Sequence, residues 1–158
     1  HGLTVAGLKK RLAELWEAAL EKTNLMPGVT ALLSALQQAG YSLAVATGAD
    51  RAWVMRWLTH FELLPYFKVV ASSDDVPNTK PAPDVYLFAA RQLGVKPERC
   101  LVFEDSVAGL QAAKAAGMKV VAVPNAVTRV LDFSAADGQI NGLDKANLSW
   151  IEAFTKTL

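Results

Sequence analysis

The sequence predicts an α/β fold in which helices cover both faces of a parallel β-sheet. Short, nearly all-apolar runs recur along the chain, and strands of this kind are buried on both faces of a sheet. Longer segments with apolar residues at helical spacing separate these runs. The resulting alternation of helix and strand is typical of a parallel sheet with helical crossovers.

The composition fits a single domain with a substantial core. The chain has 158 residues, is 52% hydrophobic and carries a net charge of +1 from 16 basic and 15 acidic residues. This balance gives no electrostatic basis for binding nucleic acid or an anionic membrane. No apolar stretch reaches the roughly 20 residues of a spanning helix, and the first residues lack a signal-peptide pattern. We therefore expect a cytoplasmic protein, with which the single cysteine, Cys100, agrees.

The first two predicted elements are helices. From Thr4 to Thr23, apolar residues fall on one helical stripe that we expect to be buried. The members of this stripe are Leu8, Leu12, Leu15, Trp16 and Ala19. A second helix is predicted from Pro27, a favoured first-turn residue, to a stop at Gly40.

The middle of the chain predicts two buried strands with a helix between them. Residues 43–46 form the first strand, and Asp50 is placed to cap a helix that ends near Phe61. Residues 67–71 form the next strand, which leads into a polar loop containing Lys80.

The second half of the chain continues the alternation. The predicted elements are a helix from Pro83 or Asp84 to Gly94, a strand at 101–103, a small-residue helix at 107–116, a strand at 120–123, an edge strand at 139–143 and a last helix at 146–154.

Polar residues that can carry chemistry follow two of these strands and occupy one loop. Thr47-Gly48 follows the strand at 43–46, Glu104-Asp105 follows the strand at 101–103, and Lys80 lies in the loop between. The carboxyl ends of parallel strands lie on one edge of the sheet, which is where ligands bind. A hydroxyl, an ammonium and two carboxylates brought together there can hold a phosphate and a divalent cation.

Each of these groups also has an ordinary structural interpretation. Glu104-Asp105 can bind magnesium through carboxylate oxygens, or Asp105 or Ser106 can cap the following helix. Thr47-Gly48 can bind a phosphate oxygen through its hydroxyl and N–H groups, or form a plain turn. Lys80 can direct its charge at a ligand from a proline-stiffened loop, or be solvated.

Taken together, the order and spacing of these residues resemble the haloacid dehalogenase (HAD) superfamily of phosphohydrolases. The likeness is closer to its branch of sugar-phosphate phosphatases, phosphoglycolate phosphatases and β-phosphoglucomutases, and it covers roughly residues 25–125. The matching segments are Met26-Pro27-Gly28-Val29, Val45-Ala46-Thr47-Gly48-Ala49, Lys80-Pro81-Ala82-Pro83-Asp84-Val85-Tyr86, Val102-Phe103-Glu104-Asp105-Ser106-Val107-Ala108-Gly109 and Ala112-Ala113-Lys114-Ala115-Ala116-Gly117-Met118.

The resemblance implies a Rossmann-like three-layer α/β/α core and a role for each group. Thr47, with Gly48, would bind the phosphate of a small phosphorylated metabolite such as a sugar phosphate. Lys80 would neutralise the phosphoryl group and the nucleophile, so Thr47 and Lys80 are the candidate catalytic residues. Glu104 and Asp105 would hold Mg²⁺. Phosphoryl transfer depends mainly on positioning and on neutralising negative charge, which agrees with these roles.

The family's nucleophile is missing from the sequence. The family reaction uses an aspartate that forms an aspartyl-phosphate, and a second aspartate two positions later as general acid and base. Asp74-Asp75 are adjacent, and Ala135 stands two positions before Asp137, so neither gives an Asp-x-Asp pattern. By the resemblance, residues 1–24 correspond to the C-terminal part of a helical cap and a linker.

Residues 25–158 would then form the core without its first strand. We expect a trough between the strand that ends at Thr47 and the strand that ends at Glu104, with unpaired edges on both sides. We also expect this chain to be an inactive fragment of a complete phosphatase, and its magnesium site to lack a ligand.

Three alternatives remain open. A phosphomutase of the β-phosphoglucomutase type keeps the same motifs and differs in cap and substrate handling. A non-catalytic relative would bind phosphorylated ligands or a protein partner. A receiver-like or nucleotide-binding domain ranks last, because no Gly-x-Gly-x-x-Gly or Gly-Lys-Ser/Thr phosphate loop occurs. The sequence indicates neither the substrate nor the oligomeric state.

Overall fold

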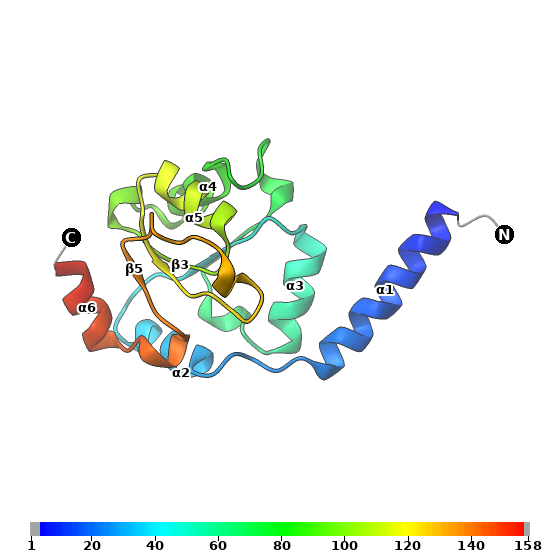
Figure 1. Ribbon diagram of the computed structural model, residues 1–158, viewed down its shortest axis with the longest axis horizontal. Helices are drawn as coiled ribbons and strands as arrows, with labels where there is room; N and C mark the ends of the chain where they lie inside the picture. The colour runs from blue at the N-terminus through cyan, green and yellow to red at the C-terminus, as the bar shows by residue number, and fades with distance from the viewer. Residues whose placement is uncertain (1–3, 157–158) are drawn as a thin grey trace.

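The computed structural model describes residues 4–156, apart from the side chains of residues 6, 9, 10, 12, 13, 16 and 21. It confirms the predicted alternation of helices and parallel strands (Figure 1). The helices in this range are α1 (Val5–Lys22), α2 (Val29–Gln38), α3 (Arg51–His60), α4 (Asp84–Leu93), α5 (Val107–Ala115) and α6 (Leu148–Lys156). None of the described helices is long and apolar enough to cross a membrane.

The strands are short and every pairing between them is parallel. They are β1 (Ala44–Ala46), β2 (Val69–Ala71), β3 (Leu101–Glu104), β4 (Lys119–Ala122) and β5 (Gly138–Gln139). β1 pairs with β2 in one sheet, and β3, β4 and β5 pair in that order in a second sheet.

The helices cover both faces of these sheets, as the α/β/α prediction requires. Successive side chains of a strand point to opposite faces. Ala44 and Ala46 of β1 and Val102 of β3 therefore face the core built with α4 and α5. Val45 faces α3, and Phe103 faces α2 and α6. Figure 1 shows the two layers, with α4 and α5 above the strands and α2 and α6 below.

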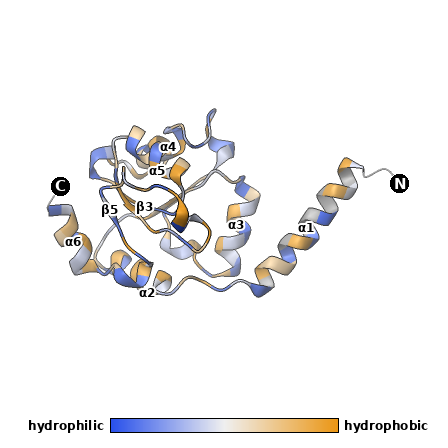
Figure 2. Cartoon of the chain, viewed as in Figure 1, coloured by the Kyte–Doolittle hydropathy of each residue, from blue (hydrophilic) through white to orange (hydrophobic). Residues whose placement is uncertain are grey.

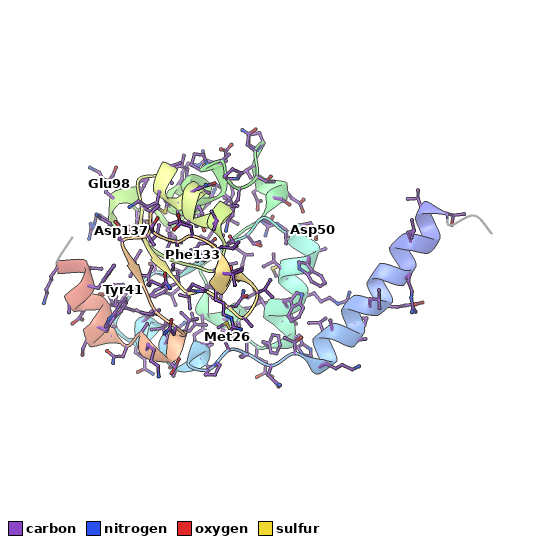
Figure 3. The ribbon with its side chains drawn as sticks, viewed as in Figure 1. Met26, Tyr41, Asp50, Glu98, Phe133 and Asp137 are labelled. Carbon is purple, nitrogen blue, oxygen red and sulfur yellow. The ribbon has the colours of Figure 1, made fainter. Side chains whose placement is uncertain are left out.

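Side-chain caps explain where three of the helices begin. The Thr4 hydroxyl accepts a hydrogen bond from Gly7 N–H, the Asp50 carboxylate accepts one from Trp53 N–H (2.7 Å), and the Ser106 hydroxyl caps α5 in the same way. Asp50 lies at the N-terminal end of α3 (Figure 3). The sequence left the α5 cap open between Asp105 and Ser106, and the structure assigns it to Ser106.

α1 projects away from the other elements, as Figures 1 and 2 show. The expected burial of its apolar stripe was wrong for Leu8, Leu15 and Ala19, which are exposed, while the side chains of Leu12 and Trp16 lie outside the described residues. The reason is that α1 meets α3 through a different face. Leu20 is buried there, and Glu17 pairs with Arg56. The three described members of the stripe are therefore left open to solvent.

The predicted edge strand at 139–143 was also wrong in its extent. β5 covers only Gly138–Gln139, and Leu143–Lys145 forms a 3₁₀ turn instead. Leu143 and Ala146 pack against Leu32 and Leu36 of α2, and the chain has to leave the sheet to bring them there. Burial of apolar side chains in this core thus overrides the β-like sequence pattern.

β1 and β3 each keep one edge that is not paired with another described strand. Thr47 N–H donates to Ala71 O (2.9 Å), and Leu43 O accepts from Lys68 N–H (2.9 Å), so these residues of the β1 segment face β2. Because backbone groups alternate along a strand, the N–H and C=O of Ala44 and Ala46 face the opposite edge.

The same alternation opens one edge of β3. Cys100 O and Glu104 O accept hydrogen bonds from Lys119 N–H (3.1 Å) and Val123 N–H (2.7 Å) on the β4 side. The backbone groups of Leu101 and Phe103 therefore face away from β4. A cavity of about 930 Å³ is lined by both β1 and β3. This cavity confirms the predicted trough between the strand ending at Thr47 and the strand ending at Glu104.

Candidate functional site

Lys80 links the ends of β1 and β3. Its Nζ donates a hydrogen bond to Ala46 O at the end of β1 (3.1 Å) and another to the Tyr86 hydroxyl in α4 (3.0 Å). It also forms an ion pair with Glu104 Oε1 at the end of β3. The structure thus brings Lys80 and Glu104 together at the carboxyl edge, next to the residue that precedes Thr47.

These contacts use every hydrogen-bond donor of Lys80. A lysine ammonium has three N–H donors, and here they meet a carbonyl, a hydroxyl and a carboxylate. The ammonium also lies over the Tyr86 ring, 4.7 Å from its centroid. Only 14% of the Lys80 side chain is exposed, so water screens this arrangement weakly.

Glu104 is the buried centre of the site. Its Oε1 accepts from Lys80 and from the Tyr86 hydroxyl, and its Oε2 accepts from Asp105 N–H (3.1 Å), Ser106 N–H (3.2 Å) and the Ser106 hydroxyl (2.9 Å). Burial raises the pKa of Glu104, but the charge of Lys80 and these hydrogen bonds outweigh it and hold the pKa below its usual range. Glu104 is therefore an ionised partner of Lys80.

Tyr86 completes this network as a donor. Burial, together with the charge of Glu104 and the hydrogen bond to it, raises the pKa of the Tyr86 hydroxyl far above its usual value. The hydroxyl consequently stays protonated. It accepts from Lys80 and donates to Glu104, so it holds both charged groups in place.

Asp105 lies beside this network and is exposed. Its Oδ2 accepts one hydrogen bond from the side-chain amide of Asn125 (2.9 Å). Among the described residues, no protein donor is bonded to its Oδ1. Asp105 is thus free to bind a cation in a way that Glu104, with both oxygens occupied, is not.

Thr47 and Gly48 lie at the turn between β1 and α3. Thr47 Oγ1 accepts from Ala49 N–H (3.1 Å), which leaves its own proton available to a ligand. Gly48 is exposed, and a Cβ built on it would meet nothing within 4 Å. The N-terminus of α3 itself is already bonded to protein carboxylates, since Asp50 accepts from Trp53 N–H and Asp74 accepts from Arg51 N–H (2.9 Å).

The residues present fit Mg²⁺ as a partial ligand set. Among the described residues, no group of three or more His, Cys, Asp or Glu side chains forms a metal cluster. Magnesium is commonly held through one or two carboxylates together with phosphate oxygens and water, and the free Asp105 carboxylate has this chemistry. Asp105 would be the protein ligand, and Glu104 would be bound to Lys80 instead.

Sequence reasoning gave no role to three groups that the site uses. Tyr86 stands in a segment quoted for the resemblance, and its position in the first turn of α4, six residues after Lys80, was a signal that the two could meet. Asn125 follows β4, the neighbour of β3, so its position just after a strand end was a usable signal. The carbonyl of Ala46 carried no signal, because every residue has one.

The fold and the site define a Rossmann-like α/β protein with a lysine–glutamate pair and a free aspartate at the carboxyl edge of its sheets. A family model described as haloacid dehalogenase-like hydrolase matches residues 3–123. The chain belongs to this family of hydrolases, as the motifs predicted.

Individual relatives agree with this assignment. Protein CbbY of Rhodobacter capsulatus is 45% identical over 128 residues, which cover 79% of this chain and 56% of that protein. The fructose-1-phosphate phosphatase YqaB of Escherichia coli is 47% identical over 81 residues, which cover 51% of this chain and 43% of that protein.

A solved structure shows the same fold. The crystal structure of CbbY from Rhodobacter sphaeroides in complex with phosphate has a TM-score of 0.84 and 32% identity, and the match covers 96% of this chain and 70% of that one. The chain spans less than two thirds of the length of the first curated relatives it matches.

Proposed function

We propose that this chain forms the phosphate- and metal-binding part of a magnesium-dependent phosphatase that acts on small phosphorylated metabolites such as sugar phosphates. The observation that carries the proposal is the Lys80–Glu104 pair, buried at the carboxyl edge with Thr47 and Asp105 on either side. Phosphoryl transfer needs positive charge and hydrogen-bond donors around the phosphoryl oxygens, and this edge supplies both.

In this proposal each side chain has one task. Thr47 Oγ1 and the Gly48 N–H bind phosphate oxygens, and Lys80 neutralises the transferred group. Glu104 and Tyr86 keep the Lys80 ammonium in position, and Asp105 holds Mg²⁺. When bound, the metal ion would neutralise negative charge on the phosphate oxygens.

The nucleophile is the part that the described residues do not supply. We propose that a strand carrying an Asp-x-Asp pattern completes the site by lying in the cavity between β1 and β3. In support, the cavity of about 930 Å³ is lined by residues of both β1 and β3. The open backbone edges of β1 and β3 would hydrogen-bond to it on both sides.

Two experiments on the gene and the complete protein test this function. The reading frame upstream of His1 should encode Asp-x-Asp at the end of an apolar run, and its absence there would overturn the enzyme assignment. The complete protein should release phosphate from sugar phosphates only with Mg²⁺. Asp105→Asn should lower this turnover by orders of magnitude, and Glu152→Gln on α6, an exposed carboxylate on the other side of the sheets, should leave it unchanged.

Two other outcomes would point to related functions. Isomerisation of a sugar phosphate without net phosphate release would identify a phosphomutase. A non-catalytic phospholigand-binding protein agrees with the absence of an Asp-x-Asp pattern from this sequence. That function predicts magnesium-dependent binding of inorganic phosphate by this chain, measured by calorimetry, with no turnover by the complete protein.

A further inference from the structure

Asn125 occupies a position that none of the motifs above assigns. It follows β4, which pairs with β3 in parallel, so the chain carries Asn125 to the same edge as Asp105. The side-chain amide nitrogen of Asn125 donates to Asp105 Oδ2 (2.9 Å). This is the only hydrogen bond that the Asp105 carboxylate receives from the described residues.

The orientation of the Asn125 amide is fixed by its own loop. Its Oδ1 accepts from Val127 N–H (2.8 Å) and Thr128 N–H (3.1 Å), and its backbone N–H donates to the Thr128 hydroxyl (3.0 Å). Because the oxygen is held by two backbone donors, the NH₂ group must point the other way, toward Asp105. The loop therefore presents one oriented donor to this carboxylate.

Such a donor has a specific effect on an exposed carboxylate. No other hydrogen bond from the described side chains holds the Asp105 carboxylate in one orientation. The amide holds Oδ2 and leaves Oδ1 open on the other side. Since the amide is neutral, it does not compete with a cation for the negative charge, as a lysine or arginine partner would.

We propose that Asn125 is a positioning residue that orients Asp105 for a divalent cation. This inference rests on the proposed function, in which Asp105 is the metal ligand. Partners of this kind, bonded to a ligand and not to the metal, typically change metal affinity by about 10- to 100-fold when they are removed. Replacing Asn125 should therefore weaken the binding of a divalent cation without removing any of its ligands.

The experiment measures Mn²⁺ binding to the complete protein by electron paramagnetic resonance, with no substrate and no turnover. Asn125→Ala should raise the dissociation constant about 10- to 100-fold. Asp105→Asn removes the proposed carboxylate ligand and should weaken Mn²⁺ binding at least as much as Asn125→Ala does. Thr128→Val is the matched control, because it removes the hydroxyl that orders the same loop and leaves the Asn125–Asp105 bond in place. Urea unfolding of each variant checks that it is folded.

The outcomes separate this inference from the function on which it rests. Unchanged Mn²⁺ affinity in Asn125→Ala, with weaker binding in Asp105→Asn, would overturn the role of Asn125 and keep that of Asp105. Equal weakening in Thr128→Val and Asn125→Ala would assign the effect to loop order and also overturn the inference. If the complete wild-type protein binds no Mn²⁺, or Asp105→Asn binds it as well as wild type, the metal role in the proposed function fails and the inference falls with it.

Discussion

At the scale of single residues, Lys80 has no spare hydrogen-bond donor in this structure. Its partners are Ala46 O, the Tyr86 hydroxyl and Glu104 Oε1. A phosphate oxygen that binds Lys80 must replace one of them. Ala46 O is the partner easiest to exchange, because Tyr86 and Glu104 are also bonded to each other.

Removing the Tyr86 hydroxyl tests this network. Tyr86→Phe keeps the ring under the ammonium but deletes hydrogen bonds to two charged groups, so the free energy of unfolding should fall by about 1.5–3 kcal/mol. Urea unfolding followed by circular dichroism measures the change. Tyr41→Phe, the same substitution at an exposed site, should stay within about 0.5 kcal/mol of wild type. Equal stabilities of the two variants would show that the hydroxyl does not hold the pair.

At the scale of elements, α5 can pack closely against the end of β3 because Gly109 has no side chain. A Cβ built on Gly109 would overlap the carboxyl group of Glu104. Glycine is therefore required here so that the Glu104 carboxyl can lie against the helix backbone, although glycine has a lower helix propensity than alanine. The small-residue pattern of this helix was visible in the sequence, but which of its residues faces the carboxylate was not.

Gly109→Ala should consequently destabilise the protein although alanine favours helices. Overpacking against Glu104 should cost about 2–3 kcal/mol and the propensity gain is about 1 kcal/mol, so the free energy of unfolding should fall by about 1–2 kcal/mol. Gln111→Ala, on the exposed face of the same helix, is the control and should change stability by less than about 0.5 kcal/mol. A Gly109→Ala protein as stable as wild type would contradict the close approach.

A second link between elements joins the 3₁₀ turn at Ser73–Asp75 to α3. Asp75 accepts hydrogen bonds from the Arg51 guanidinium and from the hydroxyl and N–H of Ser72. The Arg51 hydrogen bond, followed by the Ser72 hydroxyl, lowers the pKa of Asp75 from 3.8 to about 2. A carboxyl whose pKa is lowered on folding stabilises the folded state above its unfolded pKa and loses this effect as the pH falls through its folded pKa.

Asp75→Asn should therefore be less stable than wild type at pH 7, and the difference should narrow between about pH 4 and pH 2. Urea unfolding of both proteins at several pH values across this range measures it. A difference that stays constant down to pH 2 would show that the ionised carboxylate is not the source of the stability.

At the scale of the whole molecule, the two sheets face each other across a cavity with open backbone edges. The amides of Ala44 and Phe103 point into this gap, whereas those of Val45 and Val102 point toward β2 and β4. In hydrogen exchange followed by NMR, the first two amides should exchange orders of magnitude faster than the second two. Equal protection of all four would mean that the edges are already paired in solution.

The architecture was largely predictable, because the spacing of apolar residues distinguishes helices from strands and shows where each strand ends. The edge position of Thr47, Lys80 and Glu104-Asp105 was predicted in this way, whereas the trough was predicted from the first strand that the family resemblance implies and the sequence lacks. The exposure of Leu8 and Leu15 was not, because a helical stripe shows that a helix has an apolar side but not which element covers it. The division of roles between Glu104 and Asp105 was not predictable either, since it depends on Tyr86, Gly109 and Asn125, which come from three other segments.

The carbonyl oxygen of Ala46 belongs to the open edge of β1 and also accepts a hydrogen bond from the charged Lys80 side chain. That oxygen holds one proton of the Lys80 ammonium, and it is also the acceptor that a strand seated against β1 would use. If a strand paired with β1, its N–H would compete for Ala46 O and weaken the hydrogen bond from Lys80. One N–H of the Lys80 ammonium could then donate to a phosphate oxygen. Under the proposed function, completing the sheet would therefore also change the hydrogen bonding of Lys80, because both would use the same backbone oxygen.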